Sequence, residues 1–365
     1  MMTAINQFNP DYAVSPGMVL AERLAVQGIS HAEFARRCGR SPKLISEIIT
    51  GKAPLEPLTA LQFEKVSGVA AAVWLGIETD YRLNQARRAE TEKVASAPAI
   101  AWAKTFPWRE LVKRGCFARP RSDAECVSGL LAFFGMASVE AWNMRYGPES
   151  VAYRRATRFN SDQAALAAWR RLGELEAERQ NCTPYNMHAF KQAAVKIRAL
   201  TCQPVKEALQ AAEELCNGAG VALVVTPSLP RTALSGAAWW LSSRKAIIQL
   251  TTRYRSDDHL WFTFFHEAAH ILLHGKKGVF IDELGGDAGQ PALEAEADNW
   301  AADMLVPAQA WKQFVTASRF DKTAVRGFAA SQGIAPGIVV GRLQHEGRLP
   351  WNRLNDLKAG MPEST

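Results

Sequence analysis

Residues 259–275, HLWFTFFHEAAHILLHG, decide the fold of the C-terminal part of the chain. Between its first and last histidines, the stretch is a mostly apolar helical pattern interrupted by His266, Glu267 and His270. A helix turns by about 100° per residue, so side chains four positions apart lie on one face. His266 and His270 are therefore placed to bind one metal ion, and Glu267 can take a proton from a water molecule that the metal activates. The alternative is that they are surface or capped histidines that bind no metal, but buried polar groups without partners are costly.

A third ligand is expected in the acidic helix that follows, LEAEADNWAADMLVP at residues 293–307. Glu294 falls within the inward, apolar face of this helix, whereas Glu296 and Asp298 fall on its edges. Glu294 and Glu296 are roughly 160° apart on a helical wheel and cannot both point at one metal ion. Glu294 is the predicted ligand, and Asp298 is placed to hydrogen-bond a ligating histidine. The alternative is an ordinary amphipathic helix with solvated acids.

The segments HEAAHILLHG and EAEADNWAADMLVP together resemble the ImmA/IrrE family of metallo-endopeptidases over roughly residues 221–307. Asp298 stands where that family commonly has Asn, and Trp300 where it commonly has Phe; neither change touches the ligand set. The resemblance implies a zincin-like peptidase domain with Zn²⁺ as cofactor. The roles it implies are metal binding by His266, His270 and Glu294 and general-base catalysis by Glu267.

Other residues near the motif have less certain roles. His274 matches a later histidine of the family pattern. It can hydrogen-bond near the site or simply close the helix, and the sequence does not choose between these. A donor is needed for the oxyanion unless zinc stabilises it alone. The candidates are Tyr254, His274 and His345.

A second motif lies near the N-terminus, where residues 29–52 read ISHAEFARRCGRSPKLISEIITGK. A short helix ends at the turn residue Gly39, and Ser41-Pro42 begins the next with a cap and a proline at its first position. This spacing predicts a helix-turn-helix whose second helix enters the major groove of DNA. The alternative is a helical module that binds no DNA. The predicted DNA-facing residues are Arg40, Ser41, Lys43, Ser46, Glu47, Thr50 and Lys52.

Residues 15–85 resemble the Xre-type regulator domain, especially its HigA antitoxin branch, through this motif and the later WLGIETDY at residues 74–81. The resemblance implies binding to a palindromic DNA operator as a homodimer. Glu47 on the second helix can accept a hydrogen bond from cytosine or repel unsuitable sites. The sequence leaves both possibilities open.

The pattern elsewhere defines the fold class. Residues 221–227, 233–241 and 245–252 are short apolar runs that predict a small mixed or antiparallel sheet, and the remaining periodic segments are helical. We therefore expect a mainly α protein with a small β-sheet, an α+β fold. The expected regions are a helix-turn-helix domain at 1–88, a helical linker or sensor region at 89–216, a zinc metallopeptidase domain at 217–310 and a C-terminal helical segment packing on the peptidase at 311–365.

The composition narrows the class of protein. The 365 residues carry a net charge of +7, and 48% are hydrophobic, which excludes disorder and a disulfide-dense miniprotein. Neither a secretory signal nor an apolar run long enough to cross a membrane is evident, so we expect a cytoplasmic protein with free thiols. Residues 201–310 are net acidic and the flanking regions net basic, which is compatible with a cation site beside a polyanion partner.

The leading hypothesis joins the two motifs. A DNA-binding regulator fused to a zinc endopeptidase would cleave a repressor or an antitoxin, itself included, and derepress stress, mobile-element or defence genes. The alternative is a non-proteolytic HigA-like antitoxin or repressor whose peptidase-like domain serves as a metal sensor or docking module. The intact HEAAH motif at residues 266–270 favours the enzyme.

Overall fold

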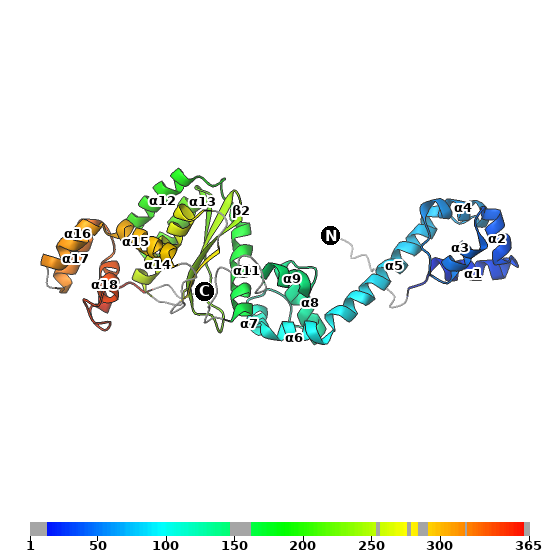
Figure 1. The fold of residues 1–365 in the computed structure, drawn as a ribbon, viewed down its shortest axis with the longest axis horizontal. Coiled ribbons are helices and arrows are strands. Elements are labelled where there is room, and N and C mark those ends of the chain that lie inside the picture. The colour runs from blue at the N-terminus through cyan, green and yellow to red at the C-terminus, as the bar shows by residue number, and fades with distance from the viewer. Residues whose placement is uncertain are drawn as a thin grey trace, which may run out of the picture. The chain divides into compact units, whose positions relative to one another are not determined.

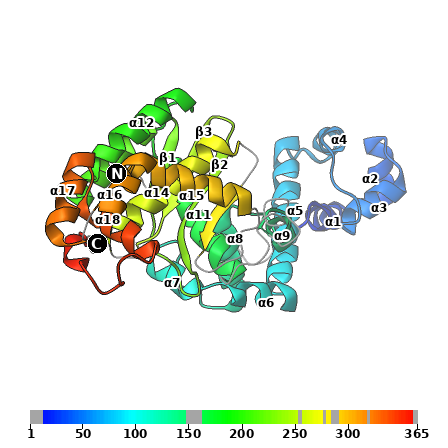
Figure 2. The same cartoon turned by 60° about the vertical axis from the view of Figure 1, so that its left-hand side comes forward.

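The computed structural model describes residues 13–146, 162–252, 256–275, 279–283, 291–317 and 320–360. The chain forms two compact units, Met1–Ala97 and Pro98–Thr365. Both are drawn in Figures 1 and 2, and each is considered by itself. The finer division into four regions that the sequence suggested stays a prediction.

The first unit is a helical bundle. Serine hydroxyls cap three of its helices: Ser15, Ser30 and Ser41 accept hydrogen bonds from backbone N–H groups in the first turns of α1, α2 and α3. Gly39 has a φ of 61° between α2 and α3, a conformation that glycine adopts readily. The helices of this unit are α1 (Pro16–Gln27), α2 (His31–Cys38), α3 (Pro42–Ile49), α4 (Pro57–Ser67) and α5 (Ala71–Val94).

The core of the first unit contains large apolar side chains from several of its helices. Phe34 of α2 and Ile45 of α3 are at most 1% exposed, and Phe63 and Trp74 are fully buried. The Phe63 ring meets Phe34 and Trp74 edge-on, with centroids 5.0 and 5.6 Å away. The α2–turn–α3 pair is therefore held on one side by its own bundle, which leaves the outer face of α3 exposed.

The second unit begins with helices and continues into a sheet. Its helices are α6 (Ala97–Thr105), α7 (Trp108–Lys113), α8 (Asp123–Phe134), α9 (Val139–Tyr146), α11 (Gln163–Arg179), α12 (Met187–Leu200), α13 (Val205–Asn217), α14 (Asp257–Leu273), α15 (Pro291–Leu305), α16 (Ala308–Ala317), α17 (Lys322–Gln332), α18 (Pro336–His345) and the 3₁₀ turn η1 (Asn355–Leu357). In the N-terminal helices, Trp102, Trp142 and Phe134 are buried and their rings meet edge-on, as expected of a helical core. Trp108 is half-buried.

The sheet is mixed and has the strand order β1-β3-β2-β4, formed by β1 (Val221–Val225), β2 (Leu234–Ser242), β3 (Lys245–Leu250) and β4 (Val279–Glu283). β1 pairs with β3 in parallel, whereas β2 is antiparallel to both β3 and β4. The mainly α fold with a small mixed sheet is thus confirmed. The sequence predicted three strands, and β4 is an additional one at the edge.

The two faces of the sheet receive different helices. α11 lies on one face, where Gln249 of β3 donates to the Trp169 carbonyl of α11 at 2.9 Å. α14 lies on the opposite face, since a Cβ added to Gly236 of β2 would meet Thr263 of α14. Figure 1 shows α11 and α14 on either side of the strands. α14 is thereby enclosed between the sheet and the C-terminal helices.

The C-terminal segment secures the beginning of α14. Asp257 accepts a hydrogen bond from the backbone N–H of Ala359 at 3.0 Å, and Lys358 forms a 2.7 Å ion pair with Asp258. Gly337 and Gly341 of α18 leave room for these two carboxylates, because a Cβ at either position would collide with them. These contacts hold the first turn of α14 in place against α18 and the C-terminal segment.

None of the described helices is by itself long and apolar enough to cross a membrane. Only when α8 and α9 are taken together, with a bend of 44° between them, are they long and apolar enough by length and composition. All six cysteines, which lie within the described ranges, carry free thiols.

Candidate metal centre

The motif helix α14 buries its polar residues in the middle of the second unit. His266, Glu267 and His270 are 5%, 0% and 1% exposed. The apolar residues around them, including Phe264 and Phe265, pack in the same core and hold the helix. With both imidazoles fixed on one face by the four-residue spacing, their Nε2 atoms lie 3.0 Å apart.

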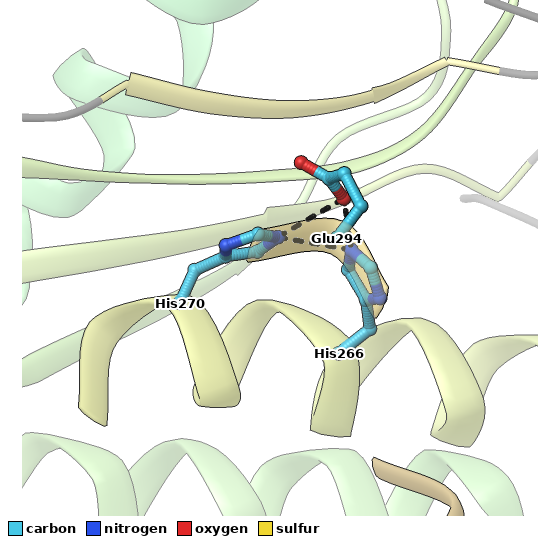
Figure 3. A group of neighbouring side chains, drawn as sticks. All are labelled: His266, His270 and Glu294. Atoms are coloured by element: carbon cyan, nitrogen blue, oxygen red, sulfur yellow. Dashed lines mark hydrogen bonds and ion pairs between the residues drawn. The ribbon is translucent and has the colours of Figure 1, made fainter. Parts of the chain in front are cut away.

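α15 brings a carboxylate to these two rings. Oε2 of Glu294 lies 3.1 Å from Nε2 of His266 and 3.4 Å from Nε2 of His270. Figure 3 shows the three side chains pointing toward one another from the two helices. One donor atom from each lies within 4.8 Å of the others. Two imidazole nitrogens, one carboxylate oxygen and convergent geometry are a donor set that fits a zinc ion with a position left open.

The protonation of these groups suits metal binding. Burial lowers the pKa of His270, and the carboxylate of Glu294 offsets only part of this effect. Burial would raise the pKa of Glu294, but hydrogen bonds from His266 and His270 outweigh it and lower that pKa to about 2. A neutral imidazole and an ionised carboxylate are the forms that bind a metal ion.

Asp298 and Glu296 of α15 contact histidines of α14. Nδ1 of His266 lies 2.9 Å from Oδ1 of Asp298, the contact that the spacing predicts. His274 ends α14, and its side chain lies between His270 and Glu296. On a helical wheel Glu296 lies away from Glu294, and the sequence indicates no partner for it. Its contact with His274 became visible only in the structure.

The carboxylate of Glu267 faces strand β2. A Cβ on Gly236 would lie 3.0 Å from Oε1 of Glu267 and 2.6 Å from the methyl group of Thr263. Glycine at this position therefore lets the strand approach the carboxylate of Glu267 closely. Sequence reasoning missed Gly236, although a glycine inside a strand often marks such an approach.

Replacement of Gly236 by alanine should move the base. We expect Gly236→Ala to lower peptidase activity by about 10²-fold, the effect of misplacing a catalytic group by roughly 1 Å, while the bound metal is kept. Gly327→Ala on α17 is the matched control, because nothing lies within 4 Å of its new Cβ. Equal activities of the two variants in a peptide cleavage assay would show that Gly236 does not position Glu267.

The oxyanion candidates other than His274 lie elsewhere. Tyr254 is outside the described residues. His345, the last residue of α18, is exposed and lies near His259, whose pKa is lowered mainly by burial and to a smaller extent by the charges of Lys358 and His345. Within the described ranges, no contact joins His345 to the three candidate ligands. Its role at the oxyanion stays a prediction.

The predicted DNA-facing residues follow the outer surface of α3 and its ends. Ser41, Lys43, Ser46, Thr50 and Lys52 are exposed; Arg40 and Glu47 are half-buried. Several of these side chains have partners within the unit: the Ser41 hydroxyl accepts from the N–H of Leu44, Arg40 donates to Gln62, and the Thr50 hydroxyl donates to the carbonyl of Ser46. Nζ of Lys43 lies 3.8 Å from Oε1 of Glu47. Because the Lys43 side chain is 85% exposed, its ammonium group is also accessible to a phosphate.

Comparison with known proteins matches both halves of this arrangement. The sequence model of the IrrE N-terminal-like domain, of the peptidase M78 family, matches residues 222–344. The uncharacterized HTH-type transcriptional regulator YddM of Escherichia coli (strain K12) is 33% identical over 73 residues, which are 20% of this chain and 78% of that protein. The second match supports a regulator-like N-terminal region.

Fold, site and matches together define a protein of two parts, a helix-turn-helix module and a peptidase domain. The chain belongs to the HTH-type transcriptional regulators and carries, fused to this module, a peptidase domain of the ImmA/IrrE family. The peptidase domain places the C-terminal unit among the hydrolases.

Proposed function

We propose that this protein is a DNA-binding transcription regulator and a zinc endopeptidase in one chain. Its peptidase would cleave a repressor or an antitoxin, with this chain itself among the candidate substrates, and so derepress stress, mobile-element or defence genes. The observation that carries the proposal is the convergence of His266, His270 and Glu294 within 4.8 Å. A general base adjoins them in the sequence, and a DNA-binding motif precedes them.

The three convergent residues would hold the metal ion. Zinc, when bound, supplies a Lewis acid that polarises the scissile carbonyl and lowers the pKa of a water molecule. The buried carboxylate of Glu267 takes the proton of the attacking water and returns it to the leaving amine. Its enclosure between α14 and β2 fixes where that proton is held. Asp298 orients His266 by accepting from its Nδ1–H group.

The DNA-binding part of the proposal predicts a salt-dependent, sequence-specific complex. The full-length protein should bind a short palindromic site near its own promoter as a homodimer. Lys43→Ala should weaken binding because a contact with a DNA phosphate is lost. Arg40→Ala should reduce, by about 1, the slope of the logarithm of the binding constant against the logarithm of the salt concentration. Fluorescence anisotropy at several salt concentrations measures both effects.

A matched control removes a positive charge elsewhere in the same unit. Lys65 is an exposed lysine on α4, and Lys65→Ala should weaken binding less than Lys43→Ala. If the wild-type protein shows no preference for any promoter site over random duplex at physiological salt, the regulator function is wrong.

The peptidase part of the proposal is tested on proteins encoded by neighbouring genes. Repressors and antitoxins encoded beside the gene are incubated with the zinc-loaded full-length protein, and products are identified by mass spectrometry. We expect one of them, or the chain itself, to be cut at a defined bond. Failure to cut any of them, while DNA is still bound, would favour the metal-sensor or docking alternative.

A further inference from the structure

Three histidines lie one turn apart along α14, and the last has not been given a role. The side chain of His274 is only 2% exposed, although the residue ends the helix. Its Nδ1 atom lies 2.8 Å from Nδ1 of His270, and its Nε2 atom lies 3.2 Å from Oε2 of Glu296. A buried ring thus connects His270 to a carboxylate on α15.

The positions of the protons follow from these contacts. A carboxylate can only accept, so Nε2 of His274 carries the hydrogen and donates it to Glu296. The Nδ1 atom of a neutral His274 is then bare and accepts from Nδ1–H of His270. His270 in turn keeps its Nε2 atom bare, and this is the atom that faces His266 and Glu294. This set of tautomers, assigned from the hydrogen-bond network, satisfies the contacts of His270 with His274 and of His274 with Glu296. It leaves the Nε2 atom of His270 without a hydrogen, as a ligand of a metal ion must be.

The other histidine has a simpler arrangement with the same result. Nδ1 of His266 contacts Asp298 directly at 2.9 Å. Each ring is thus connected through its Nδ1 atom to a carboxylate of α15. His266 contacts Asp298 directly, whereas His270 reaches Glu296 through the ring of His274. Such partners fix the tautomer and orientation of a ligand and raise its basicity.

We propose that His274 and Glu296 form a relay that fixes the Nδ1–H tautomer and the ring orientation of His270, so that both are positioning residues of the metal centre. The proposal rests on the metal site of the proposed function. The simpler alternative is that the pair only joins α14 to α15, since Glu296 is 57% exposed and such pairs contribute little to stability.

The experiment measures zinc affinity in the full-length protein by competition with a chromogenic chelator. His274→Phe keeps a ring but removes both nitrogens, and it should weaken zinc binding by about 10–100-fold, as should Glu296→Ala by a smaller factor in that range. His274→Asn should restore part of the affinity, because its amide oxygen can accept from Nδ1–H of His270. A purely packing role for His274 predicts the opposite order, with phenylalanine the better substitute.

Two controls make the result specific. Asp303→Asn removes another exposed acid of α15 and should leave zinc affinity unchanged. Unfolding of each variant without zinc should match the wild type, which separates a loss of positioning from a loss of fold. A second readout is the ¹⁵N spectrum of the imidazoles, where the Nδ1–H signal of His270 should broaden or shift in Glu296→Ala and stay unchanged in Asp303→Asn.

The outcomes separate the relay from the function on which it rests. Wild-type affinity in both His274→Phe and Glu296→Ala, with unchanged signals of His270, would overturn the relay while zinc binding itself stands. A wild-type protein that binds no zinc would instead overturn the proposed function, and the relay with it.

Discussion

Glu267→Gln should reduce cleavage of the true substrate by about 10²–10⁴-fold, the usual contribution of general acid–base catalysis. Glutamine keeps the size and shape of the side chain but cannot take a proton. Glu267 is fully buried and is not one of the three convergent donors, so zinc content and fold should be kept. The measurement is the initial rate of cleavage under saturating zinc.

The same variant distinguishes an enzyme from a sensor in cells. If cleavage releases repression, target genes should stay repressed in Glu267→Gln cells under inducing conditions, and a His266→Ala variant should behave in the same way. DNA binding should be unaffected, because the substitution lies in the other compact unit. Normal induction with Glu267→Gln would mean that peptidase chemistry does not release repression.

Trp261→Ala should destabilise the second unit by about 3–5 kcal/mol, the cost of removing a large buried aromatic side chain. Trp261 is fully buried on α14 within the core that also holds the sheet and the C-terminal helices. Loss of its ring leaves a cavity beside α14, the helix that carries His266 and His270. Urea unfolding of the full-length protein measures the effect as a change in the free energy of unfolding of the second unit.

A second tryptophan provides the control. Trp351 is 67% exposed, and Trp351→Ala should change the free energy of unfolding by no more than about 0.5 kcal/mol. Equal losses in the two variants would contradict the assignment of Trp261 to the core.

Local patterns predicted the elements that carry the function. Ser41, Pro42 and the glycine turn at residue 39 placed the second helix of the helix-turn-helix pair, and the structure confirms its start. The four-residue spacing of His266 and His270 likewise fixes which face they share. These features depend on helix geometry within one segment, which a sequence displays directly.

Features that depend on two segments could not be predicted in the same way. The strand β4, Val279–Glu283, carries two acids and no alternation, and it is defined by its pairing with β2. The contact of Glu296 with His274 joins the C-terminal end of α14 to the second turn of α15, so the periodicity of neither helix reveals it. The close approach of Gly236 to Glu267 is also a contact between a strand and a helix.

The most direct test of the account is the zinc content of purified full-length protein, measured by mass spectrometry of the metal for the wild type and three variants. We expect about one zinc ion per chain in the wild type, as three protein ligands imply. His266→Ala and Glu294→Ala should lose it, and Glu296→Ala should retain it at saturating zinc because Glu296 contacts a histidine rather than the centre. Full zinc content in Glu294→Ala with loss in Glu296→Ala would contradict the assigned metal centre.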